Sequence, residues 1–169
     1  MYQRGFTLLQ ALVSLAVIGT LAWLALGRSH EVLARLQVEL AARRLLVGLE
    51  RGREAAERIG QPCGLELTPE GWRGAATAAA EACDGGDLTL QEGLLPVQLR
   101  LEHSFAAAVK FTANGLAIDG GTAVVGASGT ELVRCVVMSP PLGVTRLGRY
   151  TGQPGGRPDP ARCLPDAEV

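Results

Sequence analysis

The sequence has few of the residues on which catalytic and cofactor sites depend. It contains 2 histidines, His30 and His103, and a lone histidine is far more often a surface or packing residue than a catalyst. Its glycine pairs lack the lysine-containing phosphate-loop pattern, and its 4 cysteines lack the close spacing of a zinc or thioredoxin-type motif. We therefore expect no catalytic residue, no metal site, no cofactor and no enzymatic activity.

Charge is missing from the run between Phe6 and Gly27, where nearly every side chain is apolar. A helix over this run, at about 1.5 Å per residue, is long enough to cross roughly 30 Å of hydrocarbon. Arg4 favours a cytoplasmic amino end, so that the chain after Arg28 lies outside. Two ordinary interpretations are a plain membrane anchor and a removable signal peptide, although the run exceeds the usual apolar region of about 7 to 15 residues in a signal peptide.

Proline is absent between His30 and Ile59, and apolar residues recur there at spacings of three, four and seven. This periodicity predicts an amphipathic helix that continues the apolar one. Gly60 and Pro62 predict its end, because glycine suits the cap and proline does not continue a helix. The expected apolar side consists of Leu33, Leu36, Leu40, Leu45, Val47, Leu49 and Ala56.

Glycine and proline become frequent from Gln61 onward, and short alternating runs predict a mostly antiparallel sheet. Asn114-Gly115 is the strongest hairpin signal, because an Asn-Gly pair suits a tight turn between strands. The residues from 61 onward therefore form one globular domain of about 110 residues, in which Trp72 anchors the sheet to the helix. The expected strands are Gly64 to Thr68, Leu88 to Gln91, Val97 to Glu102, Val109 to Thr112, Leu116 to Asp119, Thr122 to Gly126 and Leu132 to Met138.

All four cysteines lie beyond the apolar run, on the side expected to be oxidising. We therefore expect disulfides. Of three possible connectivities we favour Cys63 with Cys83 and Cys135 with Cys163, because each ties a strand to the end of a nearby irregular loop. Each closure is expected to add roughly 2 to 4 kcal/mol to the free energy of unfolding.

Residues 4–19, RGFTLLQALVSLAVIG, resemble the amino-terminal signature of type IV pilins and type II secretion pseudopilins. The resemblance implies that a prepilin peptidase cuts between Gly5 and Phe6 on the cytoplasmic side. The same enzyme would methylate the new amino group, giving N-methylphenylalanine. The chain is thereby divided into a leader peptide (1–5), a transmembrane and filament-core helix (6–27), its amphipathic continuation (28–60) and a β-rich periplasmic domain (61–169).

Gln10 departs from that family pattern, which has glutamate as the fifth residue after the cut. In the family this filament-register position is thought to neutralise the amino-terminal charge of a neighbouring subunit, and an amide does not form that ion pair. An unpaired charge in hydrocarbon costs several kcal/mol, whereas a neutral amide costs much less. The change is typical of low-abundance subunits that prime or cap a filament; the ordinary interpretation is that Gln10 hydrogen-bonds a neighbour's backbone.

The carboxy-terminal half is similar to the GspH/FimT family of minor pilins and pseudopilins. The similarity runs, in order, through VKFTANG (109–115), TAVV (122–125) and RCVVMSPPLGVTR (134–146). In that family a long helix packs on two small sheets, and the last strand pair ends near a Gly-Arg-x-Arg element. Gly143 and Arg146 fill its glycine and second arginine positions, whereas Val144 replaces the first arginine.

The fold implied by this resemblance is α+β and pilin-like. A long amino-terminal helix, with a hydrophobic spanning half and an amphipathic half, packs on a small, mostly antiparallel β-domain. The implied protein is a minor pilin or pseudopilin that primes or caps a type IV pilus or a type II secretion pseudopilus. It is a single-pass protein of the bacterial inner membrane with a periplasmic carboxy-terminal domain, and its partners are other pilins or pseudopilins, the prepilin peptidase and the inner-membrane assembly platform.

Two alternatives stay open. One is a DNA-binding minor pilin of a competence pilus, in which Arg146 and Arg149 contact phosphates and Tyr150 stacks on a base. The net charge of -1 makes a solvated loop with scattered arginines the better interpretation of this region. The other alternative is an anchored periplasmic domain with no filament role. The sequence does not separate a pilus from a secretion system, or a tip from a shaft position.

Overall fold

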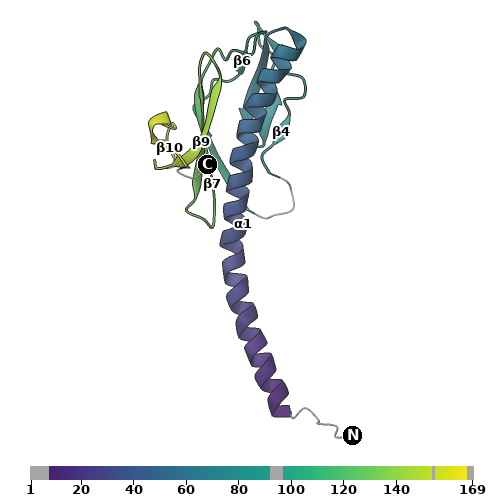
Figure 1. Cartoon of the computed structure of the whole chain (residues 1–169), viewed down its shortest axis with the longest axis vertical. Helices are drawn as coiled ribbons and strands as arrows, with labels where there is room; N and C mark the ends of the chain where they lie inside the picture. The colour runs from purple at the N-terminus through teal and green to yellow at the C-terminus, as the bar shows by residue number, and fades with distance from the viewer. Residues whose placement is uncertain (1–7, 92–96, 154, 167–169) are drawn as a thin grey trace.

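The computed structural model describes residues 8–91, 97–153 and 155–166, except for the side chains of 24–29. Its single long helix, α1 (Leu8–Ile59), projects well beyond the β-strands (Figure 1). Gly60 ends α1 as the sequence predicts, with a φ of 68° and its N–H donating to the carbonyl of Ala56 at 2.9 Å. Over the described residues, no helical stretch combines the length and the apolar character that crossing a membrane requires.

The strands form two small sheets beside the carboxyl half of α1. The first has the order β3 (Glu81–Ala82), β1 (Cys63–Thr68), β2 (Gly71–Gly74), β4 (Leu88–Thr89), and β6 (Val109–Phe111) also pairs with β1. The second has the order β10 (Cys163–Pro165), β9 (Val144–Tyr150), β8 (Val133–Ser139), β7 (Gly121–Ala127), β5 (Leu99–His103). A short 3-10 helix, η1 (Pro160–Arg162), leads into β10. Among these pairs only β1 with β3 is parallel, so the α+β, mostly antiparallel prediction for the β-rich domain is confirmed.

The face of α1 that packs on the sheets is built from small residues. Leu45, Leu49 and Ala56 are buried as predicted, whereas Leu33, Leu36 and Leu40 are exposed. The prediction for those three leucines is wrong, because the sheets pack on the opposite side of the helix. The buried face consists of Ala34, Gln37, Val38, Ala41, Ala42, Leu45, Gly48, Leu49, Gly52, Ala55 and Ala56.

Two glycines of α1 lie where the helix and the first sheet approach most closely. A Cβ on Gly48 would lie 1.9 Å from Cδ1 of Trp72, and one on Gly52 would lie 2.0 Å from Cδ1 of Leu65. The indole Nε1 of Trp72 donates to the carbonyl of Leu45 at 2.9 Å, and its side chain is fully buried. Trp72 therefore anchors the sheet to the helix, as the sequence predicts.

The predicted Asn114-Gly115 turn is present, but its second arm is shorter than expected. Gly115 has a φ of 70°, and the N–H of Thr112 donates to the carbonyl of Leu116 at 2.9 Å. Beyond the turn only the isolated bridge between Phe111 and Ala117 forms, because the chain then bends toward the β8–β9 turn, where Ala117 N–H donates to Pro141 O at 2.9 Å.

Four strands, β2, β3, β9 and β10, fall outside the predicted set. β2 and β9 contain glycine, β9 carries two arginines, and β10 ends in a proline, so none of the three reads as an alternating apolar run. β3 is a two-residue pairing at the end of the alanine-rich stretch 74–82, for which the sequence favours neither a loop nor a helical turn. These strands are held by backbone pairing with neighbours, which a pattern of side chains does not reveal.

The outer face of the second sheet, away from α1, carries a small core of its own. Val124, Val137 and Tyr150 pack there with the disulfide between Cys135 and Cys163. The second disulfide joins Cys63 to Cys83 beside the main core. Both pairings are the connectivity favoured from the sequence. The chain after β9 is thus fastened across the outer face of the sheet.

Candidate functional site

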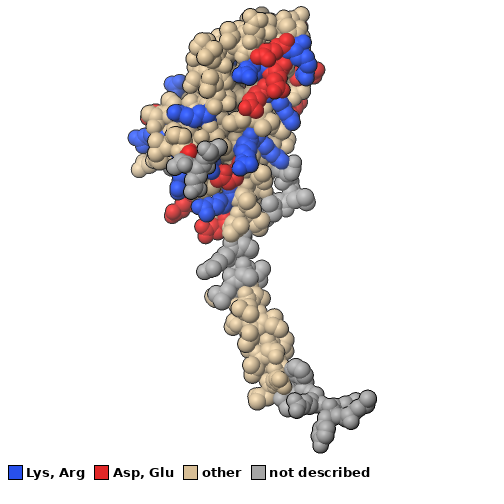
Figure 2. All heavy atoms as spheres, viewed as in Figure 1, with Lys and Arg blue, Asp and Glu red and all other residues tan. Residues whose placement is uncertain are grey.

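The first candidate surface is the side of α1 that faces away from the sheets. Val32, Leu33, Leu36 and Leu40 are exposed there, within about 100° of one another around the helix axis, at 3.6 residues per turn. The exposed apolar surface resumes in the projecting half, from Leu8 to Trp23. Figure 2 shows that the described part of this half carries neither acidic nor basic side chains, whereas both signs mix over the β-domain.

Polar groups in the projecting half are satisfied mainly by the helix itself. Ser14 Oγ donates to the carbonyl of Gln10 at 2.9 Å, and Thr20 Oγ1 donates to the carbonyl of Val17 at 2.9 Å. The side chain of Gln10 is exposed and free to meet another molecule. The predicted cleavage pair, Gly5 and Phe6, lies outside the described residues.

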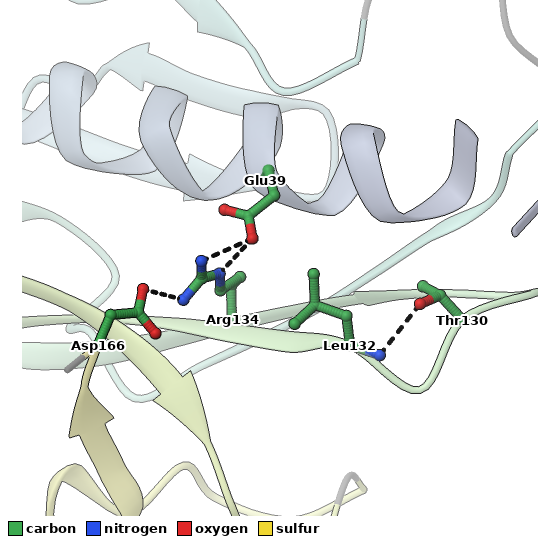
Figure 3. A network of polar contacts seen from close by, with 5 residues as sticks. All are labelled: Glu39, Thr130, Leu132, Arg134 and Asp166. Atoms are coloured by element: carbon green, nitrogen blue, oxygen red, sulfur yellow. Dashed lines mark hydrogen bonds and ion pairs between the residues drawn. The ribbon is translucent and has the colours of Figure 1, made fainter. Parts of the chain in front are cut away.

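The second candidate site is a charged cluster that joins α1 to the end of the chain. Arg134 on β8 lies between Glu39 of α1 and Asp166 just past β10 (Figure 3). Its Nε and Nη2 lie 2.8 Å and 2.6 Å from Glu39 Oε1, and its Nη1 contacts Asp166 Oδ2. Burial lowers the pKa of Arg134, but hydrogen bonds and charge from Glu39 and Asp166 outweigh it and raise that pKa, so the guanidinium stays charged.

This cluster was missed by sequence reasoning. Arg134 is the sole charged residue within β8, and alternation along the strand places it on the same face as Val136 and Met138, the face that packs toward α1. Glu39 is 95 residues away along the chain, and nothing in the sequence pairs the two. Only the packing of α1 against the second sheet brings them together, so the cluster fixes how the helix, the sheet and the carboxy-terminal strand sit relative to one another.

The residues predicted for nucleic-acid contact are partly engaged within the domain. Arg146 Nη2 donates to the carbonyl of Pro160 at 3.0 Å, and Arg149 is exposed opposite Arg134 in the β8–β9 register. Tyr150 is buried in the outer core, and its hydroxyl accepts from the N–H of Asp159 at 3.2 Å. Its ring therefore presents no free face for a base to stack on, in contrast to the expectation for the DNA-binding alternative.

Acidic groups elsewhere do not form a metal site in the part of the chain that the structure describes. No three residues of the His, Cys, Asp and Glu types gather closely enough there to hold a metal ion. Glu70, in the exposed β1–β2 turn, has its pKa lowered by the hydrogen bond from Thr68 and by its own backbone. The lowered pKa of Glu70 therefore comes from hydrogen bonds within its own turn.

The described geometry combines surfaces suited to protein contacts with a long helix packed on two small sheets. Comparison with curated proteins and with solved structures gives no match. Residues 41–142 match the family described as "Type II transport protein GspH". This segment runs from the buried face of α1 to the β8–β9 turn and covers more than half of the chain. The chain therefore belongs to the GspH family of type II transport proteins.

Proposed function

We propose that this protein is a minor pilin or pseudopilin that primes or caps a filament, either a type II secretion pseudopilus or a type IV pilus. It acts by assembly, with α1 entering a bundle formed by the helices of neighbouring subunits. Its partners are then other pilins or pseudopilins, and the inner-membrane platform on which the filament is built. Family membership supports the secretion or pilus setting.

The observation that carries the proposal is the apolar stripe on the outer side of α1. Val32, Leu33, Leu36 and Leu40 lie beside the globular domain yet pack on none of its core clusters. Monomeric proteins rarely leave a contiguous apolar surface of this kind exposed, and such a surface marks a contact with protein or lipid. Because the stripe is aligned with the apolar projecting half, one neighbouring helix running along α1 would cover both.

The proposal includes a membrane stage before assembly. The uncharged run from Phe6 to Gly27 supports it, because the run is long enough to span a bilayer as a helix. The residues of this run before Leu8 and the side chains at 24–27 lie outside the described part. In this scheme the β-rich domain is periplasmic, where its two disulfides persist. The helix exchanges lipid contacts for subunit contacts when the filament forms.

Maturation of the amino terminus tests this function. We expect mass spectrometry of the chain purified from membranes of cells with an active prepilin peptidase to find N-methyl-Phe6 as the first residue. Replacing Gly5 by a bulkier residue should block the cut and leave Met1 in place. A mature chain that keeps its leader, or one that starts at Arg28, would contradict the proposal.

A second readout separates filament assembly from simple anchoring. If the protein is only an anchored periplasmic domain, the Gly5 variant will leave secretion or piliation unchanged. If it primes or caps a filament, the same variant will reduce both the number of filaments and the export that depends on them.

A further inference from the structure

The outer face of the second sheet, away from α1, holds a cavity of about 470 Å³. Its floor is formed by the start of β7, the end of β8 and Ser104, the residue that follows β5. Its wall is the segment that leads into η1, which lies on this side of the sheet (Figure 1). Ligand pockets in proteins enclose roughly 300 to 1,000 Å³ and combine apolar surface with a few polar groups. This cavity has that size, and its lining has that composition.

Three hydroxyl side chains line the floor: those of Ser104, Thr122 and Ser139. Thr122 lies opposite Val137 in the β7–β8 register, and Ser139 follows two residues later on the same face of β8. Thr122 is only 1 % exposed, and no described group forms a hydrogen bond with its hydroxyl, although its N–H donates to Ser104 Oγ at 3.0 Å. Buried hydroxyls are normally hydrogen-bonded, so a ligand in the cavity would supply the partner that the fold does not.

Arg157 is the sole charged side chain among the described residues that line the cavity. It is exposed, and no described residue forms an ion pair or a hydrogen bond with its guanidinium. Asp159 follows closely in the chain, but its carboxylate accepts the N–H of Ala161 at 2.9 Å and so caps η1. The cavity therefore presents a guanidinium without a competing acid. One such group suits one carboxylate, which it binds through two parallel hydrogen bonds, rather than the row of phosphates along a nucleic acid.

Apolar surface lies beside these polar groups. Val137 and Pro158 are buried, and Pro160 completes the wall. A simple oxyanion would fill only a small part of the cavity and would leave this surface uncovered. A sugar ring matches the lining better, because its C–H faces are apolar and its hydroxyls donate and accept hydrogen bonds, as serine and threonine hydroxyls do.

We propose that this cavity binds an acidic sugar, that is, a pyranose ring that carries one carboxylate. The carboxylate pairs with Arg157, the ring hydroxyls bond Thr122 and its two neighbouring serines, and a C–H face of the ring lies against Val137 and the prolines. Glycans built from uronic acids and glycans built from N-acetylmuramic acid both carry this chemistry. The site shares no residue with the apolar stripe of α1, so this proposal and the filament function stand or fall separately.

Saturation-transfer NMR titrations with the full chain in detergent test the proposal. The probes are D-glucuronic acid and N-acetylmuramic acid. D-glucose and N-acetylglucosamine are the matched sugars without a carboxylate, and N-acetylglycine is a carboxylate without a sugar ring. We expect at least one acidic sugar to bind saturably and at least about tenfold more tightly than its neutral counterpart and than N-acetylglycine. The acidic sugar that binds more tightly identifies the kind of glycan.

Two variants place the ligand in the cavity. Arg157→Gln should weaken binding of the acidic sugar at least about tenfold, because it removes the charge-assisted bonds. Thr122→Val should weaken binding about fivefold without lowering the midpoint of chemical denaturation, because the lost hydroxyl has no partner within the fold. Arg100→Gln is the matched control: it removes an exposed arginine of β5 that lines a different cavity, and it should leave the affinity unchanged.

The contrary results are equally defined. The proposal is wrong if neither acidic sugar binds saturably, or if the neutral sugars or N-acetylglycine bind as tightly. Equal losses in Arg157→Gln and Arg100→Gln would reveal unspecific attraction between charges. Parental affinity in Thr122→Val, or a lowered denaturation midpoint in that variant, would show that its hydroxyl is not reserved for a ligand, and this too would overturn the assignment.

Discussion

Gly48 shows how much of this fold depends on the absence of one carbon atom. The indole of Trp72 occupies the space that a Cβ would take and donates its hydrogen bond to Leu45 O. Glycine inside a helix costs about 1 kcal/mol relative to alanine, so its presence here is compensated by the packing of the largest side chain in the core. The close approach of helix and sheet thus depends on the pairing of a small residue with a large one.

Gly48→Ala should lower the free energy of unfolding by about 1 to 3 kcal/mol, because the new methyl group overlaps Trp72 and forces the helix and sheet apart. Chemical denaturation of the full chain in detergent, followed by tryptophan fluorescence, measures the change. Gly19→Ala is the control: nothing lies within 4 Å of that position, so the substitution removes only the helix penalty of glycine and should not destabilise the protein. A Gly48→Ala protein as stable as the Gly19→Ala protein would show that Trp72 has another way to pack.

The packing around Tyr150 and Arg134 likewise limits what these two residues can contact. As residue types in a sequence, both suit the recognition of nucleic acid. In the fold, Tyr150 lies within the outer core and Arg134 is held between two carboxylates. Their neighbours, rather than their chemistry, decide what they are free to contact.

At the scale of elements, α1 uses its two sides for different purposes. The side rich in alanine and glycine, which also buries Leu45 and Leu49, packs on the sheets, and the side that carries Leu33, Leu36 and Leu40 is left exposed. A helix that served only its own domain would have no reason to keep those three leucines exposed. Their exposure is expected where they are reserved for neighbouring helices.

Leu36→Glu with Leu40→Glu should therefore leave the stability of the isolated subunit within about 0.5 kcal/mol of the parent, because both side chains are exposed. Assembly should be strongly reduced, because two charges would enter an apolar helix contact. Leu45→Glu is the contrasting variant: it buries a charge in the core and should prevent folding. Denaturation of the purified chain and filament counts in cells measure the two effects, and normal filament numbers in the double variant would contradict the proposed helix packing.

The carboxy-terminal strand is joined to the rest of the fold in three ways. β10 pairs with β9, Cys163 is bonded to Cys135, and Asp166 contacts Arg134. Through Arg134 and Glu39 this strand is linked to α1, so the end of the chain helps to hold the helix against the second sheet.

At the scale of the whole molecule, charge argues against nucleic-acid binding. The formal net charge is -1, Arg146 donates a hydrogen bond to the carbonyl of Pro160, and acidic residues lie among the exposed arginines. Binding through phosphates needs several unpaired cations on one face and weakens steeply with salt.

A filter-binding assay with the full chain in detergent should therefore show no salt-sensitive retention of double-stranded DNA above that of a detergent blank. Arg146→Ala with Arg149→Ala should give the same result as the parent. Retention that falls steeply with salt in the parent and is lost in the double variant would establish the DNA-binding alternative instead.

The long helix, its end at Gly60, the Asn114-Gly115 turn, the α+β class and the preferred pairing of the four cysteines could all be predicted from the residues alone. Each of these depends on local backbone preference, on periodicity or on short closures, all of which are properties of neighbours along the chain. Three features could not be predicted: which side of α1 is buried, the completion of the second sheet by β9 and β10, and the contact of Arg134 with Glu39 and Asp166. Those outcomes depend on the volumes and hydrogen bonds of groups far apart in the sequence, such as Trp72 opposite Gly48, and they exist only once helix and sheets are packed together.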